Sequence, residues 1–265
     1  MQIHHLNCVS ACPLGGAPMD GFSKRSLRGR LTSHCMLIEL DHTLVLVDTG
    51  YGLRDVHDPG SRLSPFFLAL NAPERREAMT AIRQIEALGY NPRDVRQIVL
   101  SHLDFDHAGG LDDFPHATVH LLGEEIAAAV AQRTMLDRMR YRPQQWEGSR
   151  GAWQAHHTAA GEHWFGFQCV RDLPGIGPDV LMVPLIGHTL GHAGIAVRRG
   201  SGWLFYAADA YFYHAEMDVE RPRCTPGLRA YQKLMEKNRR LRLLNQRRLR
   251  ELRKAEGEKV RIFCA

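Results

Sequence analysis

The residues best suited to chemistry lie in one short stretch, Ser101 to Gly110. His102, Asp104, Asp106 and His107 put four side chains able to bind a metal within six positions. Imidazole nitrogens and carboxylate oxygens are ligands for Zn²⁺, Mn²⁺ and Fe²⁺, whereas a purely structural zinc site more often recruits cysteine, which this stretch lacks. The stretch therefore predicts a reactive metal centre, against the simpler alternative of a polar loop.

Three other segments end in residues of the same kind. Asp48 follows one apolar run, His188 and His192 follow another, and Asp209 closes a third; the central stretch itself follows the run 98–100. Short apolar runs of this length are typical of buried strands. Because α/β proteins place their sites at strand ends, we expect these segments to converge on one site.

The predicted elements alternate irregularly between strands and helices. Residues 51–72 are predicted to form a loop, and residues 141–166 an irregular insertion. Strands are predicted at 3–9, 35–40, 44–47, 98–100, 117–122, 167–170, 180–183, 194–197, 203–207 and 259–264, and helices at 73–88, 124–139 and 226–255. Two mixed sheets packed together, with helices outside, accommodate this order in a single α/β domain spanning residues 1–265.

The positive charge of the chain is concentrated in one segment. The formal net charge is +5, but residues 228–256 alone carry eleven Lys or Arg against three Glu. This segment is predicted to be an amphipathic helix with leucines 234, 241, 244, 249 and 252 on its apolar face. Such a helix usually packs on its own sheet; contact with a membrane surface or a homodimer is the alternative.

Cysteine usage and the chain's hydropathy indicate a reducing location. The six cysteines are scattered and form no C-x-x-C pair, which is typical of free thiols. No run approaches the length of a membrane span, and the first residues lack the pattern of a signal peptide. We therefore expect a cytoplasmic protein that does not bind a membrane.

Taken together, the motifs resemble those of the metallo-β-lactamase superfamily. They are Asp-Thr-Gly at 48–50, a cluster similar to H-x-H-x-D-H at 102–107, G-H-T-x-G-H at 187–192 and the strand-end Asp209, in the same order and over nearly the whole chain. The sequence around the two His motifs is most similar to the branch containing N-acyl homoserine lactone hydrolases. The resemblance implies an αββα sandwich and a small-molecule ester or lactone as substrate.

The resemblance also implies two divalent metal ions, with zinc the expected metal. The implied ligands are His102, Asp104 and His188 for the first metal, Asp106 and His107 for the second, and Asp209 between the two. Asp48 would orient the ligand loop, and His192 is expected to be structural.

Asp104 departs from the family pattern, which has a His at this position. In a formal count, the three Asp ligands, two divalent metals and one hydroxide sum to zero, one unit less positive than with His. The site should then be a weaker Lewis acid, and its harder oxygen ligation favours Mn²⁺ or Fe²⁺ more than a His-rich site would. The diiron branch of the superfamily, with Glu here, is similar in this respect.

The family also supplies one more His for the second metal, just after the last strand, and this chain ends before such a residue. We expect that the sequence is truncated there. Alternatively, the second metal is bound by Asp106, His107, Asp209 and water, or His214 or Cys264 takes the place of the missing ligand.

The reaction that the resemblance implies is metal-assisted hydrolysis. Asp106 would hold the nucleophilic water and accept its proton, and would then protonate the leaving alkoxide. Tyr211 or Tyr213 could donate a hydrogen bond to the substrate carbonyl, although ordinary packing is the alternative for both tyrosines.

Three other functions stay open. A phosphodiesterase or nuclease is suggested by the basic helix, but no added nucleic-acid-binding domain is seen, so nucleic acid is not the expected partner. A catalytically weak, binding-only descendant is suggested by Asp104 and the missing His. A thiol-ester hydrolase of the glyoxalase II type is a further enzymatic variant.

Overall fold

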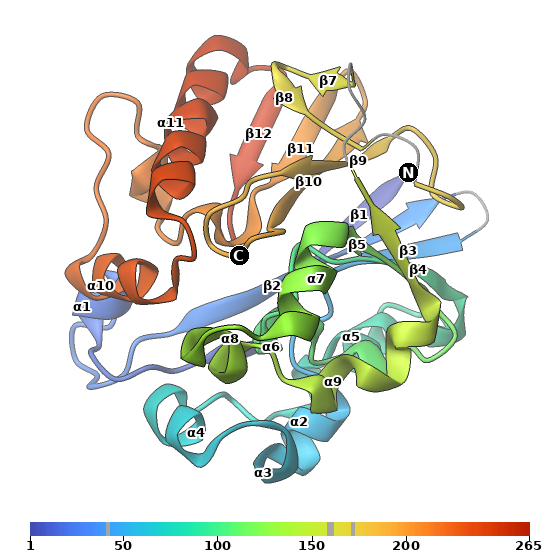
Figure 1. Ribbon diagram of the computed structural model, residues 1–265, viewed down its shortest axis with the longest axis vertical. Coiled ribbons are helices and arrows are strands. Elements are labelled where there is room, and N and C mark those ends of the chain that lie inside the picture. The colour runs from blue at the N-terminus through green and yellow to red at the C-terminus, as the bar shows by residue number, and fades with distance from the viewer. Residues whose placement is uncertain (41–42, 158–161, 171–172) are drawn as a thin grey trace.

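Two mixed β-sheets pack face to face, and helices cover the outer face of each (Figure 1). The computed structural model describes residues 1–40, 43–157, 162–170 and 173–265. The predicted αββα sandwich is therefore confirmed.

The first sheet has six strands in the order β1-β2-β3-β4-β5-β6. Its strands are β1 (Gln2–Ala11), β2 (Leu31–Leu40), β3 (Thr43–Val47), β4 (Val95–Val99), β5 (Thr118–Leu122) and β6 (Trp153–His156). The strands predicted at 35–40 and 44–47 are present as β2 and β3, which pair antiparallel from Met36 with Val47 to Leu40 with Thr43. Strands β3 to β6 run parallel to one another. Residues 41 and 42 lie outside the described residues.

The second sheet has four strands in the order β12-β11-β10-β9. Its strands are β9 (Val180–Pro184), β10 (Ala193–Arg199), β11 (Gly202–Tyr206) and β12 (Val260–Phe263). The last strand pairs parallel to β11, whereas the other two pairs are antiparallel. A separate hairpin joins β7 (His163–Trp164) to β8 (Phe167–Gln168), so the strand predicted at 167–170 is shorter than expected.

Both faces of the first sheet are buried, which explains why its strands read as continuous apolar runs. Alternate residues of β2 and β3 point to opposite sides. Met36 and Val45 pack between the two sheets, whereas Leu37 and Leu46 pack beneath the outer helices. A third cluster fills the space between the second sheet and the last helix, where Leu249 packs against the sheet.

The helices predicted at 73–88 and 124–139 are wrong in length. The helix predicted from residue 73 begins only at Ala81, because the backbone N–H of Glu74 bonds to Ser10 and holds this part of the chain against β1. The helix predicted at 124–139 is two helices, because Gln132 takes a left-handed conformation and Thr134 caps a new helix. The resulting helices are α5 (Ala81–Ala87), α7 (Gly123–Ala131) and α8 (Met135–Arg140).

The segment predicted as a loop at 51–72 contains short helices. Pro59 and Pro65 are each the first residue of one, a position where proline's missing N–H costs nothing. The helices are α2 (Leu53–His57), α3 (Pro59–Arg62) and α4 (Pro65–Asn71). The insertion predicted as irregular likewise holds α9 (Pro143–Trp146) and the edge strand β6. Its residues 158–161 lie outside the described residues.

The basic helix predicted at 226–255 is broken into two, α10 (Pro226–Met235) and α11 (Arg239–Glu256). Asn238 caps α11, and the backbone N–H groups of Lys237 and Asn238 bond to the carbonyl of Gly187. The predicted leucine face is only partly right. Leu249 and Leu252 are buried, but Leu234 is 69% exposed. Short helices α1 (Ala17–Asp20) and α6 (Phe105–Ala108) complete the set.

None of the described helices is long and apolar enough to cross a membrane.

Candidate metal centre

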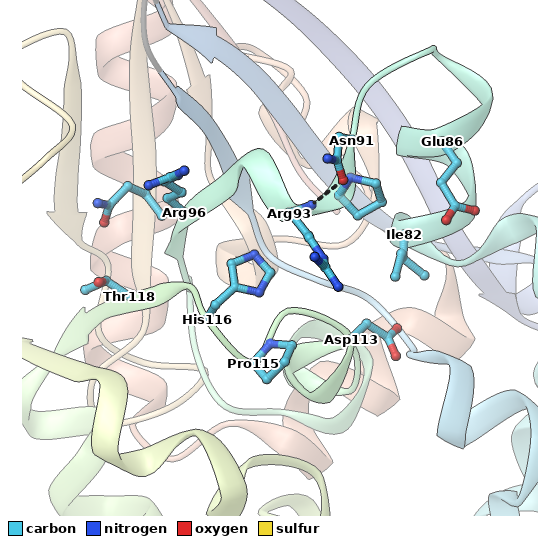
Figure 2. Close-up of a pocket in the computed structure, with 11 residues that line it drawn as sticks. Ile82, Glu86, Asn91, Arg93, Arg96, Asp113, Pro115, His116 and Thr118 are labelled. Atoms are coloured by element: carbon cyan, nitrogen blue, oxygen red, sulfur yellow. Dashed lines mark hydrogen bonds between the residues drawn. The ribbon is translucent and has the colours of Figure 1, made fainter.

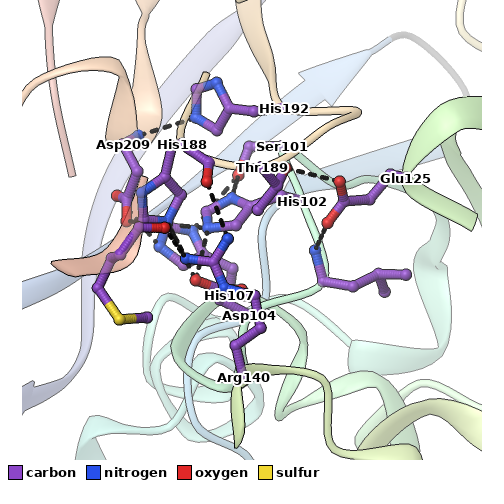
Figure 3. A network of polar contacts seen from close by, with 12 residues as sticks. Ser101, His102, Asp104, His107, Glu125, Arg140, His188, Thr189, His192 and Asp209 are labelled. Carbon is purple, nitrogen blue, oxygen red and sulfur yellow. Dashed lines mark hydrogen bonds and ion pairs between the residues drawn. The ribbon is translucent and has the colours of Figure 1, made fainter. Parts of the chain in front are cut away.

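The predicted metal-binding segments meet at one end of the sandwich (Figure 3). Asp48 follows β3 directly, the stretch 101–107 follows β4, His188 follows β9 and Asp209 follows β11. Each segment thus leaves the carboxyl end of a strand. The packing of the two sheets brings side chains far apart in sequence into contact there, as the strand-end pattern predicted.

The carboxylate of Asp209 lies between two groups of side chains. Its Oδ2 is 3.2 Å from Nε2 of His188 and 3.8 Å from Nε2 of His102, whereas its Oδ1 is 3.4 Å from Nε2 of His107. Asp104 belongs to the first group, with Oδ2 3.0 Å from Nε2 of His188 and 3.5 Å from Nε2 of His102. Asp209 therefore turns one oxygen to each group, as a bridging ligand would.

The residues present fit divalent cations. The ligand atoms of His102, Asp104 and His188 all lie within 4.8 Å of one another, and so do those of His102, His107 and Asp209. Among the described residues, the buried Nε2 of His102 has no hydrogen-bond partner. An unpaired nitrogen at the centre of a buried cluster of acids is costly unless a cation binds it.

Asp48 fixes the orientation of the two neighbouring imidazoles. Its Oδ2 accepts hydrogen bonds from Nδ1 of His107 and from Oγ of Ser101, each at 2.7 Å. Nδ1 of His102 in turn donates to that serine Oγ at 2.9 Å. Because each Nδ1 proton is held in this way, the ring proton that a metal ion would displace is the one on Nε2, which faces the site; this is the usual support for a metal-binding histidine.

The backbone is strained at two of these strand ends. Asp48 and Ala208, which precedes Asp209, have φ values of 53° and 44°, in the left-handed region that residues other than glycine rarely adopt. Such conformations cost about 1–3 kcal/mol each and persist where the surrounding contacts enforce them. Here they turn Asp48 and Asp209 out of their strands and toward the site.

His192 supports Asp209 and is not placed as a ligand. Its Nδ1 donates to the carbonyl of Leu185 at 3.1 Å, and its Nε2 accepts the backbone N–H of Asp209 at 3.0 Å. Both ring nitrogens are thus used within the protein. The structural role expected for this histidine agrees with these contacts.

Electrostatics at the site follow from burial and from the density of acids. Burial opposes ionisation of Asp104, but the charges of Arg140 and His102 outweigh it and hold the pKa of Asp104 well below its usual range. Burial raises the pKa of Asp106 to about 6, and the nearby Asp209 and Asp104 add to the rise. Burial would lower the pKa of His107, yet Asp209 and Asp48 raise it well above the usual value.

The predicted catalytic residues lie in different surroundings. Asp106 is partly exposed and lines a pocket of about 260 Å³ that opens onto the site, although it belongs to neither compact ligand group. Tyr211 is buried, packs in the core between the second sheet and α11, and does not line this pocket. The tyrosines that line it are Tyr213 and Tyr231.

Tyr231 is a candidate that sequence reasoning missed. It comes from α10, and its ring lies 5.7 Å from that of Phe212. Burial raises its pKa, and the charges of Asp106 and Asp104 raise it further, so the hydroxyl keeps its proton beside these acids. Only its place on a helix after a proline start was visible in the sequence.

The two candidates for a substitute ligand, His214 and Cys264, also line the pocket. Neither belongs to a metal-binding group among the described residues. Burial raises the pKa of the Cys264 thiol to about 12, and the nearby Asp209 contributes. His214 stacks on Phe22, with ring centroids 6.2 Å apart.

Two buried charged residues that sequence reasoning missed hold the ligand loops. Glu125 accepts hydrogen bonds from the N–H of Leu103 and Gly191 and from Oγ1 of Thr189, so it joins the two His loops. Arg140 lies 3.2 Å from Oδ1 of Asp104. Neither position carried a local signal, since a charged residue in a short helix is usually solvated.

A larger hollow lies away from this site (Figure 2). It has a volume of about 920 Å³, and its exposed lining residues include Arg93, Arg96, Pro115 and His116. No ion pair to either arginine is found within the described part of the chain. The metal centre is therefore not in this larger hollow.

Comparison with known proteins places the chain in a family. The model of the metallo-β-lactamase superfamily matches residues 28–250. The whole chain is 40% identical to the "Probable metallo-hydrolase" of Mycobacterium tuberculosis, of which it covers 80%. An N-acyl homoserine lactonase of Bacillus cereus is 33% identical over 95 residues, 36% of this chain and 38% of that protein. The chain belongs to the metallo-β-lactamase superfamily, and the class of enzyme expected from its sequence, a metallo-hydrolase, is confirmed.

Solved structures agree on the fold. The structure of an N-acyl homoserine lactone hydrolase with N-hexanoyl-L-homoserine at its metal centre matches with a TM-score of 0.71 and 21% identity, over 99% of this chain and 92% of that one. A "probable metal-dependent hydrolase" from Staphylococcus aureus matches with a TM-score of 0.72 and 16% identity, over 99% and 88%. At these identities the likeness concerns the fold.

Proposed function

We propose that this protein is a two-metal hydrolase that cleaves a carboxylic ester or lactone, with N-acyl homoserine lactones as the first substrates to test. The observation that carries the proposal is the convergence of three imidazole Nε2 atoms on Asp209, with Nδ1 of two of these rings fixed from behind. This arrangement is prepared for metal ions before they bind.

The residues that would hold the metals are those expected from the sequence. Asp104, His102 and His188 would hold the first, and Asp209 would be shared. The second would be held by His107 with Asp106 and Asp209, supplemented by water. Two divalent cations here would supply a nucleophile from water near neutral pH and polarise the carbonyl under attack. Zinc is the first metal to test, with Mn²⁺ and Fe²⁺ as alternatives.

Asp106 is assigned the proton transfers. Its carboxyl lines the pocket and is partly exposed, whereas Asp104 and Asp209 are more deeply buried. A carboxyl in this position can take the proton of the attacking water and return it to the alkoxide that leaves when the ester bond breaks.

Tyr231 is assigned the hydrogen bond to the substrate carbonyl, in place of the Tyr211 expected from the sequence. Its side chain lines the pocket together with Asp106 and Asp104; its own burial and the charges of these acids raise its pKa, so its hydroxyl keeps a proton to donate to the negative charge that develops on the carbonyl oxygen. Removal of one such donor typically lowers turnover by about 100-fold or more. We therefore expect Tyr231→Phe to lower kcat while Tyr211→Phe leaves it unchanged.

The shape of the pocket supports a small substrate. Besides the acids, its lining includes Phe22, Leu31, Phe212 and Leu228. Apolar walls around a few polar groups are typical of sites for small organic molecules. An acyl chain could lie along these walls while the ester or lactone reaches the metal centre.

The phosphodiesterase alternative has weaker support. Several arginines of α11 are engaged within the protein: Arg242 pairs with Glu236 at 2.7 Å, Arg248 lies over the ring of Phe167, and Arg253 donates to the carbonyl of Met217. The basic segment is thus in part a packing surface and not a free phosphate-binding face.

The experiment is a hydrolysis screen of the metal-loaded protein. The panel contains N-acyl homoserine lactones, simple aryl esters, a thioester and bis-p-nitrophenyl phosphate, each also tested after chelation and after metal is restored. Chelator-sensitive cleavage of lactones or esters is the expected result. Cleavage of the phosphodiester alone would contradict the proposal.

A further inference from the structure

Arg140 is a buried cation at the first metal site (Figure 3). Its side chain is fully buried, and its Nε lies 3.2 Å from Oδ1 of Asp104, whose side chain is 4% exposed. The N–H does not point at this oxygen well enough to form a hydrogen bond, so the contact is an ion pair. The other oxygen of Asp104 stays directed at His102 and His188.

The guanidinium also holds the backbone around the site. One terminal nitrogen donates to the carbonyl of His188 at 2.9 Å, and the other donates to the carbonyl of Met235 at the end of α10. Arg140 therefore contacts both His loops and the helix beyond them. A buried arginine is costly unless it is paired, so its position depends on Asp104.

The charge of Arg140 changes the electrostatic consequence expected for Asp104. From the sequence, an Asp in place of the family's His makes the formal charge of the loaded site one unit less positive. The guanidinium of Arg140 restores one unit of positive charge, with its Nε 3.2 Å from Oδ1 of Asp104. The two side chains together carry the charge of one neutral imidazole.

We propose that Asp104 and Arg140 form one neutral ligand unit, in which Asp104 binds the first metal and Arg140 is the positioning residue that orients its carboxylate and cancels its charge. The inference rests on the proposed metal centre and deepens it. It implies that Asp104 does not by itself make the centre a weaker Lewis acid.

The test is the affinity for Zn²⁺, measured by competition with a chromophoric chelator on the purified chain. Asp104→His should weaken binding at the first site by at least about tenfold, because it leaves an unpaired guanidinium a few ångströms from a dication. Adding Arg140→Gln, which removes the charge but keeps an amide donor for the backbone carbonyls, should restore affinity to near the parental value. Adding Arg140→Lys, which keeps the charge, should not.

Whether Arg140→Gln strengthens or weakens Zn²⁺ binding in the Asp104→His background separates this role of Arg140 from a merely structural one. If Arg140 only supports the backbone, Arg140→Gln will weaken binding further in the Asp104→His background, and the proposal is overturned. Parental affinity in Asp104→His alone would also overturn it. If the parental protein binds Zn²⁺ but Arg140→Gln does not restore the affinity of Asp104→His, only this inference fails. If the parental protein binds no metal, the proposed function itself fails.

Discussion

Two hollows of this protein, the one beside the metal centre and the larger one lined by Arg93, both hold acidic and basic side chains but differ in how those side chains are placed. The larger one, at the foot of β4 and β5, is lined by exposed residues such as Arg93 and His116. The smaller one opens onto His107 and Asp209, whose side chains are buried and oriented by other residues. Size therefore does not identify the reactive site here.

In the smaller hollow, by contrast, the candidate ligands are held in fixed orientations by contacts with other residues. Nδ1 of His107 is held by Asp48, the backbone of Asp209 is held by His192, and Glu125 ties the two His loops together. None of these contacts takes part in the reaction itself. Together they keep the ligand atoms of the imidazoles and carboxylates directed at a space suited to cations. Variants in the two hollows should therefore have very different effects.

The largest effect is expected for His102→Ala. The Nε2 of His102 would hold the first metal and lies 3.8 Å from Oδ2 of Asp209, which the two metals would share, so the first metal should be lost and the second should bind more weakly. Loss of a residue that only orients a ligand typically costs about 10–100-fold in affinity or activity, and loss of the ligand itself should exceed this. Metal content and turnover are measured together, with His116→Ala in the larger hollow as the control. Parental metal content in His102→Ala would rule out this ligand.

Asp48→Asn should come next. Its Oδ2 accepts hydrogen bonds from Ser101 Oγ, His107 and Tyr206, and its Oδ1 accepts the backbone N–H of Ser101, so an amide, which has only one acceptor oxygen, leaves buried donors unpaired. We expect the metal affinity to fall about 10–100-fold while the fold is kept. Chelator competition gives the affinity, and circular dichroism gives the fold. An unchanged affinity would show that the imidazoles do not depend on this carboxylate.

Glu125→Gln should mainly lower stability. The Oε2 of Glu125 accepts from both Thr189 and Gly191, and an amide nitrogen in either position would leave a buried donor without an acceptor. The expected loss is about 1–3 kcal/mol in the free energy of unfolding, measured in urea. Glu124→Gln, whose side chain is 51% exposed, is the matched control and should have little effect. Equal effects for the two variants would contradict the assigned role.

The smallest effect is expected in the larger hollow. Arg93 and Arg96 are exposed, and no ion pair to them is found among the residues that the structure describes. Their replacement by Ala should change the free energy of unfolding by no more than about 0.5 kcal/mol and leave hydrolysis unchanged. A marked loss of turnover would show that the larger hollow takes part in the reaction.

The convergence of the candidate metal-binding residues could be predicted because its signal is local. Short apolar runs followed closely by His or Asp mark strands and their ends, and the parallel pairing of β3 with β4 brings Asp48 beside the stretch 101–107. The break between α7 and α8 also had a local signal, the capping pair Thr134 and Asp137, which the apolar pattern of the longer segment obscured.

Other features depend on contacts that sequence does not reveal. Arg140 lies 36 positions after Asp104, at the end of a short helix, and nothing nearby marks it as buried. Tyr211 packs in the core after a strained turn at Ala208 and does not line the pocket. Tyr231, which does line it, comes from a helix that no motif connects to the site. Which residues far apart in the sequence come into contact is decided by the tertiary structure.

The measurement that tests the account most directly is elemental analysis of the purified chain after zinc loading and removal of unbound metal. We expect about two zinc ions per chain, falling to about one or fewer in His102→Ala. A parental chain that retains no metal, with content indistinguishable from the variant, would contradict the central claim that these residues form a metal centre.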